Sequence, residues 1–143
     1  MAISKATAKW SGTLKEGNGS MKSGTGFFDL PFTFVSRFEG SKTATNPEEL
    51  IGAANAGCFS MFLAAQLSAA GHPPTSIETT ATVTLGDLGG GPGITKIELE
   101  TSAVVPGVPQ ALFDEKVAFS KQHCPISRAL AAVPELTVKA TLG

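Results

Sequence analysis

The stretch NPEELIGAANAGCFSMFLAAQLSAA, residues 46–70, decides the fold. Asn46 can accept a backbone hydrogen bond as an N-cap, and Pro47 suits the first position of a helix. Glu48 and Glu49 lie at the positive end of the helix dipole, and Glu49 also occupies the capping-box position. We therefore predict a helix that begins at this cap and ends with this stretch, where a glycine and two prolines follow.

The predicted helix is apolar on nearly every side, which indicates burial over most of its surface. No charged residue occurs from Leu50 to Gly71, so a membrane span is one interpretation. Asn55, Gln66 and the many alanines argue against it, as does the lack of Lys or Arg anchors on the far side. We expect the core helix of a soluble protein. Its small residues would let another backbone approach closely. A single chain of this length has few other elements to bury such a helix, so a dimer is favoured.

Alternation of apolar and polar residues predicts strands on both sides of this helix. Before the helix, strands are expected at Lys5–Ser11, near Ser20–Thr25 and near Phe32–Phe38, with a turn at Glu16–Ser20. After it we expect a hairpin with strands at Ile77–Leu85 and Lys96–Val105. Helices at about Gln110–Gln122 and Cys124–Ala132 and a last strand at Leu136–Leu142 should follow. The fold class is α+β, in the order βββ-α-ββ-αα-β, with residues 1–143 forming one domain.

Charge and composition exclude several kinds of partner. The formal net charge is -1, and neither Lys nor Arg occurs from Thr43 to Thr95. Nucleic acid and anionic membrane surfaces are therefore not expected partners. The segment Met1–Trp10 has no apolar region of the kind found in secretory signals, so we expect a cytoplasmic protein.

The only two cysteines, Cys58 and Cys124, are the candidates for chemistry. Cys58 lies in the middle of the buried helix, where a small core residue is an equally good interpretation. A thiol at that position gains little from the helix dipole, so a reactive Cys58 would need a nearby cation. Arg37 is the candidate cation, although it also fits a surface position at the end of a strand.

The neighbouring sequence argues more strongly for a reactive thiol at Cys124 than at Cys58, because Pro125 follows Cys124 and marks the start of a helix. The partial positive charge at that end lowers the pKa of a thiol, but a capping cysteine without a redox role fits the same position. The two cysteines are 66 positions apart, so they form no CxxC motif, and their spacing neither supports nor excludes contact.

The sequence gives little support for a metal site, a phosphate-binding loop or a serine nucleophile. The two histidines, His72 and His123, cannot complete a zinc site without both cysteines, so no metal is expected. The glycine-rich run at Gly86–Gly93 lacks the pattern of a phosphate-binding loop and is typical of a hairpin tip. No nucleophile elbow of the Gly-x-Ser-x-Gly type occurs.

Several motifs together resemble the OsmC/Ohr family of thiol-dependent peroxidases. They are Arg37-Phe38-Glu39-Gly40, Thr45–Ala54, Gly57–Met61, Pro74–Ile77, Ile94–Ile97, Val105-Pro106-Gly107 and Cys124-Pro125-Ile126-Ser127. The resemblance covers essentially the whole chain and includes both cysteines. It is nearer to the OsmC (osmotically inducible protein C) branch, because the Arg-Phe-Glu-Gly segment directly precedes the Asn-Pro-Glu-Glu helix start.

The resemblance implies specific roles in a peroxidase site. Cys58 would attack the peroxide and become a sulfenic acid, and Cys124 would resolve it as an intramolecular disulfide. Arg37 and Glu48 would match the family's arginine–glutamate pair, which holds the thiolate and orients the substrate. Glu48 is chosen because it lies ten residues before Cys58, and Glu49 is the alternative.

The resemblance also implies the substrate, the partners and the assembly. Apolar walls formed by Phe59, Met61 and Phe62 would favour organic hydroperoxides over hydrogen peroxide. The chain would need no cofactor, since an external dithiol, a dihydrolipoyl group or a lipoylated protein would serve as reductant. The fold would be OsmC-like, with antiparallel sheets around a long buried central helix, in an intertwined homodimer with sites at the subunit interface.

Two alternatives belong to other functional classes. A non-enzymatic dimeric module could bind an apolar, lipid-like ligand at the subunit interface, and its binding would survive the loss of both thiols. A thiol redox sensor could act on a partner protein, but no sequence feature marks a surface for that partner.

Overall fold

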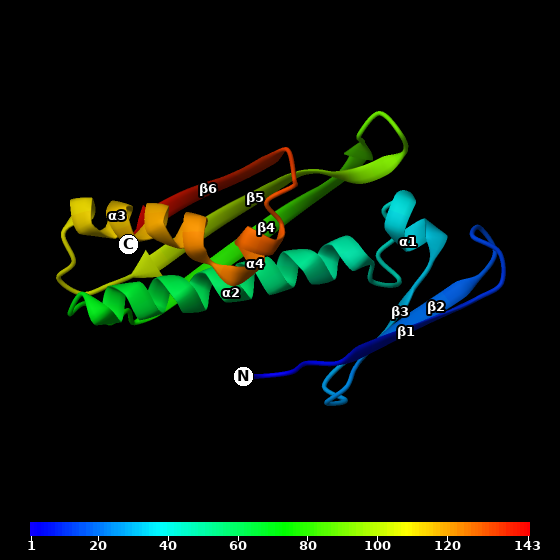
Figure 1. Ribbon diagram of the computed structural model, residues 1–143, viewed down its shortest axis with the longest axis horizontal. Coiled ribbons are helices and arrows are strands. Elements are labelled where there is room, and N and C mark those ends of the chain that lie inside the picture. The colour runs from blue at the N-terminus through cyan, green and yellow to red at the C-terminus, as the bar shows by residue number, and fades with distance from the viewer. The chain divides into compact units, whose positions relative to one another are not determined.

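The computed structural model describes all 143 residues, which form two compact units, Met1–Leu50 and Ile51–Gly143. The first unit contains β1, β2, β3 and α1, and the second contains β4, β5, α3, α4 and β6 (Figure 1). The long helix α2, Pro47–Ala69, begins in the first unit and continues in the second. The single domain over residues 1–143 stays a prediction.

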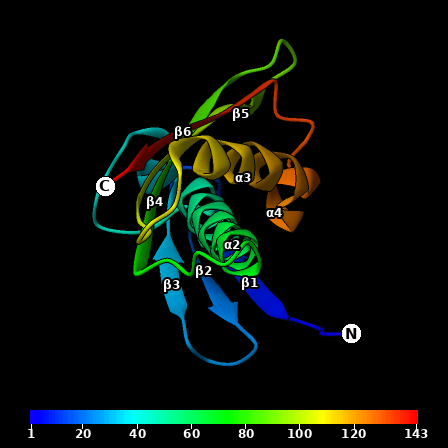
Figure 2. The same ribbon diagram turned by 90° about the vertical axis from the view of Figure 1, so that its left-hand side faces the viewer.

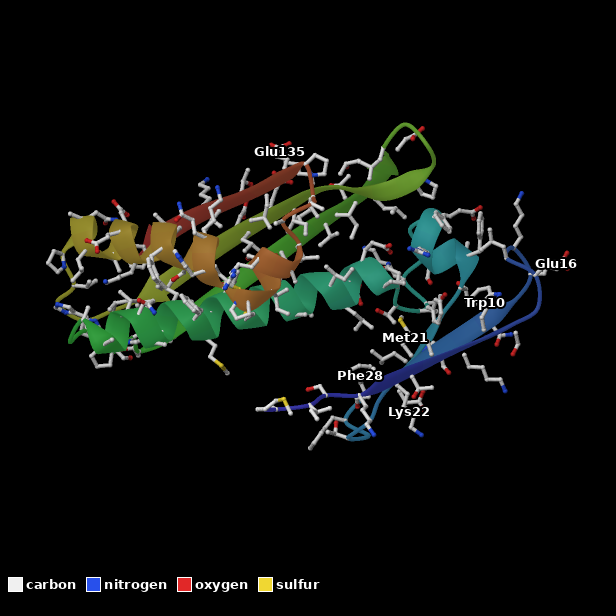
Figure 3. The ribbon with its side chains drawn as sticks, in the orientation of Figure 1. Trp10, Glu16, Met21, Lys22, Phe28 and Glu135 are labelled. Atoms are coloured by element: carbon white, nitrogen blue, oxygen red, sulfur yellow. The ribbon has the colours of Figure 1, made fainter.

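The first unit contains a three-stranded antiparallel sheet in the order β1-β2-β3. Its strands are β1, Ala6–Ser11, β2, Asn18–Ser23, and β3, Asp29–Phe32. The register places Trp10 and Met21 on one face of this sheet and Lys22 on the other (Figure 3). Trp10 packs against Phe32, with ring centroids 5.3 Å apart. The strand predicted near Ser20–Thr25 corresponds to β2, which begins and ends two residues earlier, at Asn18 and Ser23.

The strand predicted at Phe32–Phe38 is wrong beyond its first residue, because α1, Phe34–Phe38, is a short helix. Thr33 caps it in a reciprocal capping box. The Ser36 N–H donates to Thr33 Oγ1 at 3.1 Å, and the Thr33 N–H donates to Ser36 Oγ at 2.9 Å. These local bonds satisfy the first helical donors and outweigh the strand propensity of the aromatic residues. Arg37 consequently lies in a helix rather than at the end of a strand.

The cap predicted for α2 is present. The Glu49 N–H donates to Asn46 Oδ1 at 2.8 Å, as an N-cap requires. The Glu49 carboxylate does not complete a capping box but accepts a hydrogen bond from Thr45 Oγ1 at 2.8 Å. The helix ends at Ala69, and Gly71 takes the positive φ of 86° that follows a helix end.

By length and composition α2 could cross a membrane. One of its faces, however, belongs to the core of the second unit. Phe59, Leu63 and Leu67 lie on this face and have no exposed surface. They pack against the second sheet, so α2 is a core helix along this face. Its opposite face is open in the single chain, so the predicted burial on most sides is not reached within one chain.

The second unit is built on a three-stranded sheet in the order β4-β5-β6. Its elements are β4, Ser76–Asp87, β5, Pro92–Val104, α3, Gln110–His123, α4, Pro125–Ala129, and β6, Glu135–Leu142. The hairpin of β4 and β5 is antiparallel as predicted. The last helix ends at Ala129 rather than at the predicted Ala132.

The expectation of purely antiparallel sheets is wrong for β6, which pairs with β5 in parallel. Two helices, α3 and α4, connect these strands, and such a crossover returns the chain to the end where β5 began. The sheet is therefore mixed.

The helices α2, α3 and α4 cover one face of this sheet (Figure 2). From Ile97 to Ala103 every second residue of β5 points into the core that they form, and Ile97, Leu99 and Ala103 are each at most 1% exposed. Phe113 of α3 is also fully buried. The opposite face carries the polar residues of the period-two pattern, so it can face water.

Candidate active site

The two cysteines, far apart in the sequence, meet inside the second unit. Cys58 Sγ on α2 and Cys124 Sγ lie 2.9 Å apart, within hydrogen-bonding distance, and both residues are free thiols. Cys58 is half-buried and Cys124 has no exposed surface. The thiols are therefore in contact in the reduced state, a question that the sequence spacing left open.

Cys124 sits at the junction of two helices, which fixes its backbone. It follows the last residue of α3 and precedes Pro125, the first residue of α4. Its N–H donates to the Ser120 carbonyl at 2.9 Å, and its carbonyl accepts from the Arg128 N–H at 2.9 Å. The predicted position of Cys124 at a helix start is confirmed.

The contact between the sulfur atoms affects their ionisation in opposite directions. Burial raises the pKa of Cys58, and the neighbouring Cys124 raises it further against the opposing effect of the Ile126 N–H. Burial also raises the pKa of Cys124, but the neighbouring Cys58 thiol and the start of α4 at Ile126 and Ser127 outweigh this effect and lower that pKa. Burial thus disfavours a thiolate on Cys58, and a positive charge near this sulfur would favour one.

The first unit brings together the second predicted pair, Arg37 and Glu48. Arg37 Nη2 and Nε donate to Glu48 Oε1 at 2.8 and 3.1 Å. The side chain of Glu48 is 9% exposed and that of Arg37 is 37% exposed. The guanidinium also lies 5.3 Å from the centre of the Phe38 ring, so a carboxylate and an aromatic face hold it together. Glu49 bonds Thr45 instead and does not take part.

This pair retains unused hydrogen-bonding capacity. Both donors of Arg37 reach the same oxygen, and Glu48 Oε2 is buried without a partner. Guanidinium carries further N–H donors beyond the two that are used here. The half-exposed Arg37 therefore keeps donors that a small polar molecule can reach, whereas Glu48 Oε2 is buried.

The three apolar residues predicted to line the substrate site have unlike surroundings. Phe59 is fully buried in the core, whereas Met61 is 77% exposed. Phe62 is half-buried and stacks against Phe119, with ring centroids 6.2 Å apart. A single chain thus does not gather the three side chains onto one wall. No group of three or more His, Cys, Asp or Glu side chains is placed to hold a metal ion.

Sequence reasoning missed a polar pair beside the cysteines. Asn55 precedes Cys58 by one turn of α2, and its Nδ2 donates to Ser127 Oγ at 2.9 Å. Asn55 is fully buried, and its Oδ1 has no partner. The only signal in the sequence is a polar amide within a largely apolar stretch of the helix, and this signal does not identify the partner.

Comparison with known proteins identifies the family. The family described as OsmC-like protein matches residues 39–139, more than half of the chain. The chain belongs to the OsmC-like family. The peroxiredoxin OsmC of Escherichia coli (strain K12) is 46% identical to this OsmC-like protein over 129 residues, which is 90% of each chain. At this similarity the chain is an enzyme of the peroxidase type, as expected.

Solved structures share the fold of this OsmC-like protein. An OsmC-like protein from Mycoplasma pneumoniae has a TM-score of 0.75 at 18% identity, with 99% of this chain and 97% of that chain covered. An organic hydroperoxide resistance protein from Elizabethkingia anophelis, with thiocyanate bound, has a TM-score of 0.74 at 25% identity and the same coverage. The predicted OsmC-like fold is thus confirmed, with two sheets and a central helix.

The contact between the sulfur atoms predicts how a mild thiol oxidant will act on this OsmC-like protein. Because both sulfurs lie in one unit of one chain, diamide should link Cys58 to Cys124 within the chain. Peptide mass mapping should show the two cysteine peptides joined, and a non-reducing gel should show no covalent dimer. The Cys58→Ser variant should form no such link. Covalent dimers in the native protein would contradict this arrangement.

Proposed function

We propose that this chain reduces organic hydroperoxides, and more weakly hydrogen peroxide, to alcohols or water, through a sulfenic acid on Cys58 that Cys124 resolves as a disulfide. The observation that carries the proposal is the 2.9 Å contact between the two sulfur atoms. A sulfenic acid formed on one member of such a pair lies next to the thiol that can capture it. Capture protects the sulfenic acid from further, irreversible oxidation.

The first step is a displacement on the peroxide. The Cys58 thiolate attacks one oxygen of the O–O bond, which breaks, and the other oxygen leaves as an alkoxide that takes up a proton. The sulfur of Cys58 is oxidised to S–OH and the hydroperoxide is reduced to an alcohol. Cys124 then displaces hydroxide from Cys58 and forms the disulfide.

The role proposed for Arg37 and Glu48 is carried over from the resemblance and agrees with their chemistry. A fixed guanidinium favours a thiolate and can donate to peroxide oxygens as the negative charge develops there. The raised pKa of Cys58 explains why the reaction needs such a cation. Glu48 would hold the guanidinium in place through its Oε1 atom.

The substrate class rests on apolar residues and on relatives. One solved relative, 25% identical to this chain, is named as an organic hydroperoxide resistance protein. We propose that Phe59, Met61 and Phe62 provide the apolar surroundings that favour an organic group. We also propose that a small dithiol, a dihydrolipoyl group or a lipoylated protein reduces the disulfide, without a bound cofactor, and that the protein works in the cytoplasm in defence against oxidative and osmotic stress.

Replacing the cysteines one at a time tests the order of the two steps. Cys58→Ser should abolish turnover of cumene hydroperoxide in a dithiol-coupled assay, because the attacking sulfur is lost. Cys124→Ser should still consume one equivalent of hydroperoxide, but its sulfenic acid should persist, react with dimedone and over-oxidise. Mass spectrometry of the treated protein distinguishes the two variants.

Undiminished turnover by Cys58→Ser would contradict the proposed mechanism. The alternative, a dimeric module that binds an apolar ligand without catalysis, predicts tight binding that survives the loss of both thiols. Fluorescence titration of the doubly substituted protein with a fatty-acid probe would then show unchanged affinity.

Substitution of Arg37 tests the proposed cation. Arg37→Gln should slow the oxidation of Cys58 by about a hundredfold, the scale on which removal of one stabilising donor acts. Arg37→Lys, which keeps the charge but not the planar fork, should fall between this variant and the native protein. Lys22→Gln removes a charge from the first sheet and should leave the rate unchanged. If Cys58 is oxidised as fast in Arg37→Gln as in the native protein at saturating hydroperoxide, Arg37 has no part in the mechanism.

The open face of α2 supports a homodimer. This face carries small or apolar side chains without charge, all of them exposed in the single chain: Ala53, Ala54, Gly57, Met61 and Ala65. Exposed apolar patches of this kind mark interaction sites, and small side chains allow close approach of two helices. We propose that a second copy of the chain covers this face, in the intertwined arrangement that the resemblance implies.

Gly57 provides a clean test of the dimer. A Cβ atom at Gly57 would meet nothing within 4 Å in the single chain, so a side chain there fits the folded protomer. Gly57→Leu should therefore leave the fold intact while it obstructs a partner helix, and sedimentation should show a shift from dimer to monomer. Gly90, at the hairpin tip, is equally open, and Gly90→Leu should remain dimeric. A native chain that sediments as a monomer would contradict the proposed assembly.

A further inference from the structure

The two thiols of the reduced chain form a pair that helical structure holds on both sides. Cys58 Sγ and Cys124 Sγ lie 2.9 Å apart, and Cys58 is fixed in the middle of α2. The Cys124 N–H donates to the Ser120 carbonyl, and the Cys124 carbonyl accepts from the Arg128 N–H, each at 2.9 Å. The two sulfur atoms are therefore close together before any ligand arrives.

Two sulfurs held together bind a ligand that takes both of them far more tightly than either sulfur alone. Once the first bond has formed, the second is intramolecular, and such linkage raises affinity by about 10²- to 10⁴-fold. In an unfolded chain the same two thiols would first have to close a loop across 66 positions, at a cost in chain entropy. The folded chain is therefore the form that chelates.

The pair offers two sulfur ligands and no third side chain. No group of three or more His, Cys, Asp or Glu residues is placed to hold a metal ion, which disfavours zinc, because zinc sites take three or four protein ligands. Thiolates select soft centres such as copper(I). Copper(I) and mercury(II) held by only two ligands prefer a straight line, however, and this arrangement needs sulfurs on opposite sides of the ion rather than in contact.

Trivalent arsenic suits two sulfurs in contact. It makes three bonds in a shallow pyramid with angles near a right angle, so two of its sulfur ligands lie side by side. Its third position keeps an organic group or a hydroxyl. Cys58 is half-buried whereas Cys124 has no exposed surface, so an arsenical would reach the pair from the side of Cys58.

We propose that the reduced pair of Cys58 and Cys124 is a chelating site for trivalent arsenicals. This inference goes beyond the proposed function, since binding needs no peroxide. With phenylarsine oxide, two As–S bonds form, the arsenic–oxygen bond breaks, and the oxygen leaves as water with the two thiol protons. Arsenic stays trivalent and neither sulfur is oxidised. Because the occupied pair has no free thiol, turnover of hydroperoxide would also stop, and this consequence alone rests on the proposed function.

The test titrates the reduced full-length protein with phenylarsine oxide in the absence of peroxide. Intact-mass spectrometry under denaturing conditions should show one phenylarsenic group on each chain and no covalently joined chains. Dimercaptopropanol, a dithiol, should remove this group, whereas mercaptoethanol at the same thiol concentration should not. Arsenous acid, whose third substituent is only a hydroxyl, is the second probe and tests the site if a phenyl ring lacks room.

Cys58→Ser and Cys124→Ser should each bind phenylarsine oxide at least about a hundredfold more weakly, because one sulfur remains. The matched control combines Cys58→Ser with Ser60→Cys. It keeps two thiols, but the side chain of Ser60 is directed to Thr79 of β4, with 2.7 Å between their hydroxyl oxygens. This double variant should bind as weakly as Cys58→Ser. Native protein oxidised with diamide, which needs no substitution, should bind neither probe.

Native protein that loses both probes to mercaptoethanol as readily as Cys58→Ser does would overturn this inference. Equally tight binding by the double variant would also overturn it, because contact between the sulfurs would then not matter. Protein that chelates the probes but turns over no hydroperoxide would overturn the proposed function and leave this inference standing.

Discussion

Two thiols on different parts of the chain can react with one another only while the core holds their sulfur atoms in contact. Cys58 and Cys124 lie 66 positions apart, and no local motif joins them. Phe59, next to Cys58, and Phe113 in α3 are fully buried, and Leu130 at the end of α4 packs against the same core. Burial of each large apolar side chain contributes about 1.5–3 kcal/mol. The geometry of the sulfur pair is therefore maintained by the whole second unit rather than by the residues beside it.

The contact that lets the two sulfurs join also opposes the ionisation of one of them. Closely coupled thiols share their protons, so a change that favours a thiolate on Cys124 disfavours one on Cys58. The lowered pKa of Cys124 suits the proposed resolving step, in which this sulfur would be the nucleophile. The raised pKa of Cys58 is unfavourable for the first step. A peroxidase built on this pair therefore gains from positive charge near Cys58 in the first step, which is the role proposed for Arg37.

Local patterns predicted most of the elements but not their partners. The N-cap at Asn46 and the period-two alternation of β4 and β5 are properties of neighbouring residues, and both predictions are confirmed. The helix α1 was missed because a run of aromatic residues concealed the cap formed by Thr33 and Ser36, although both residues are plain in the sequence. The parallel pairing of β6 has no local signal, since it depends on where α3 and α4 return the chain.

Neighbouring residues were likewise not enough to predict the site. The residues themselves made the cysteines and Arg37 candidates, but only the family resemblance added Glu48 and gave each residue a role. The resemblance did not point to Asn55. Its Oδ1 atom is buried without a partner, and such an unpaired amide oxygen lowers the stability of a fold by about 1–3 kcal/mol. An apolar residue at this position of α2 would avoid that cost. The other end of the same amide is paired, since its Nδ2 donates to Ser127 Oγ and joins α2 to α4.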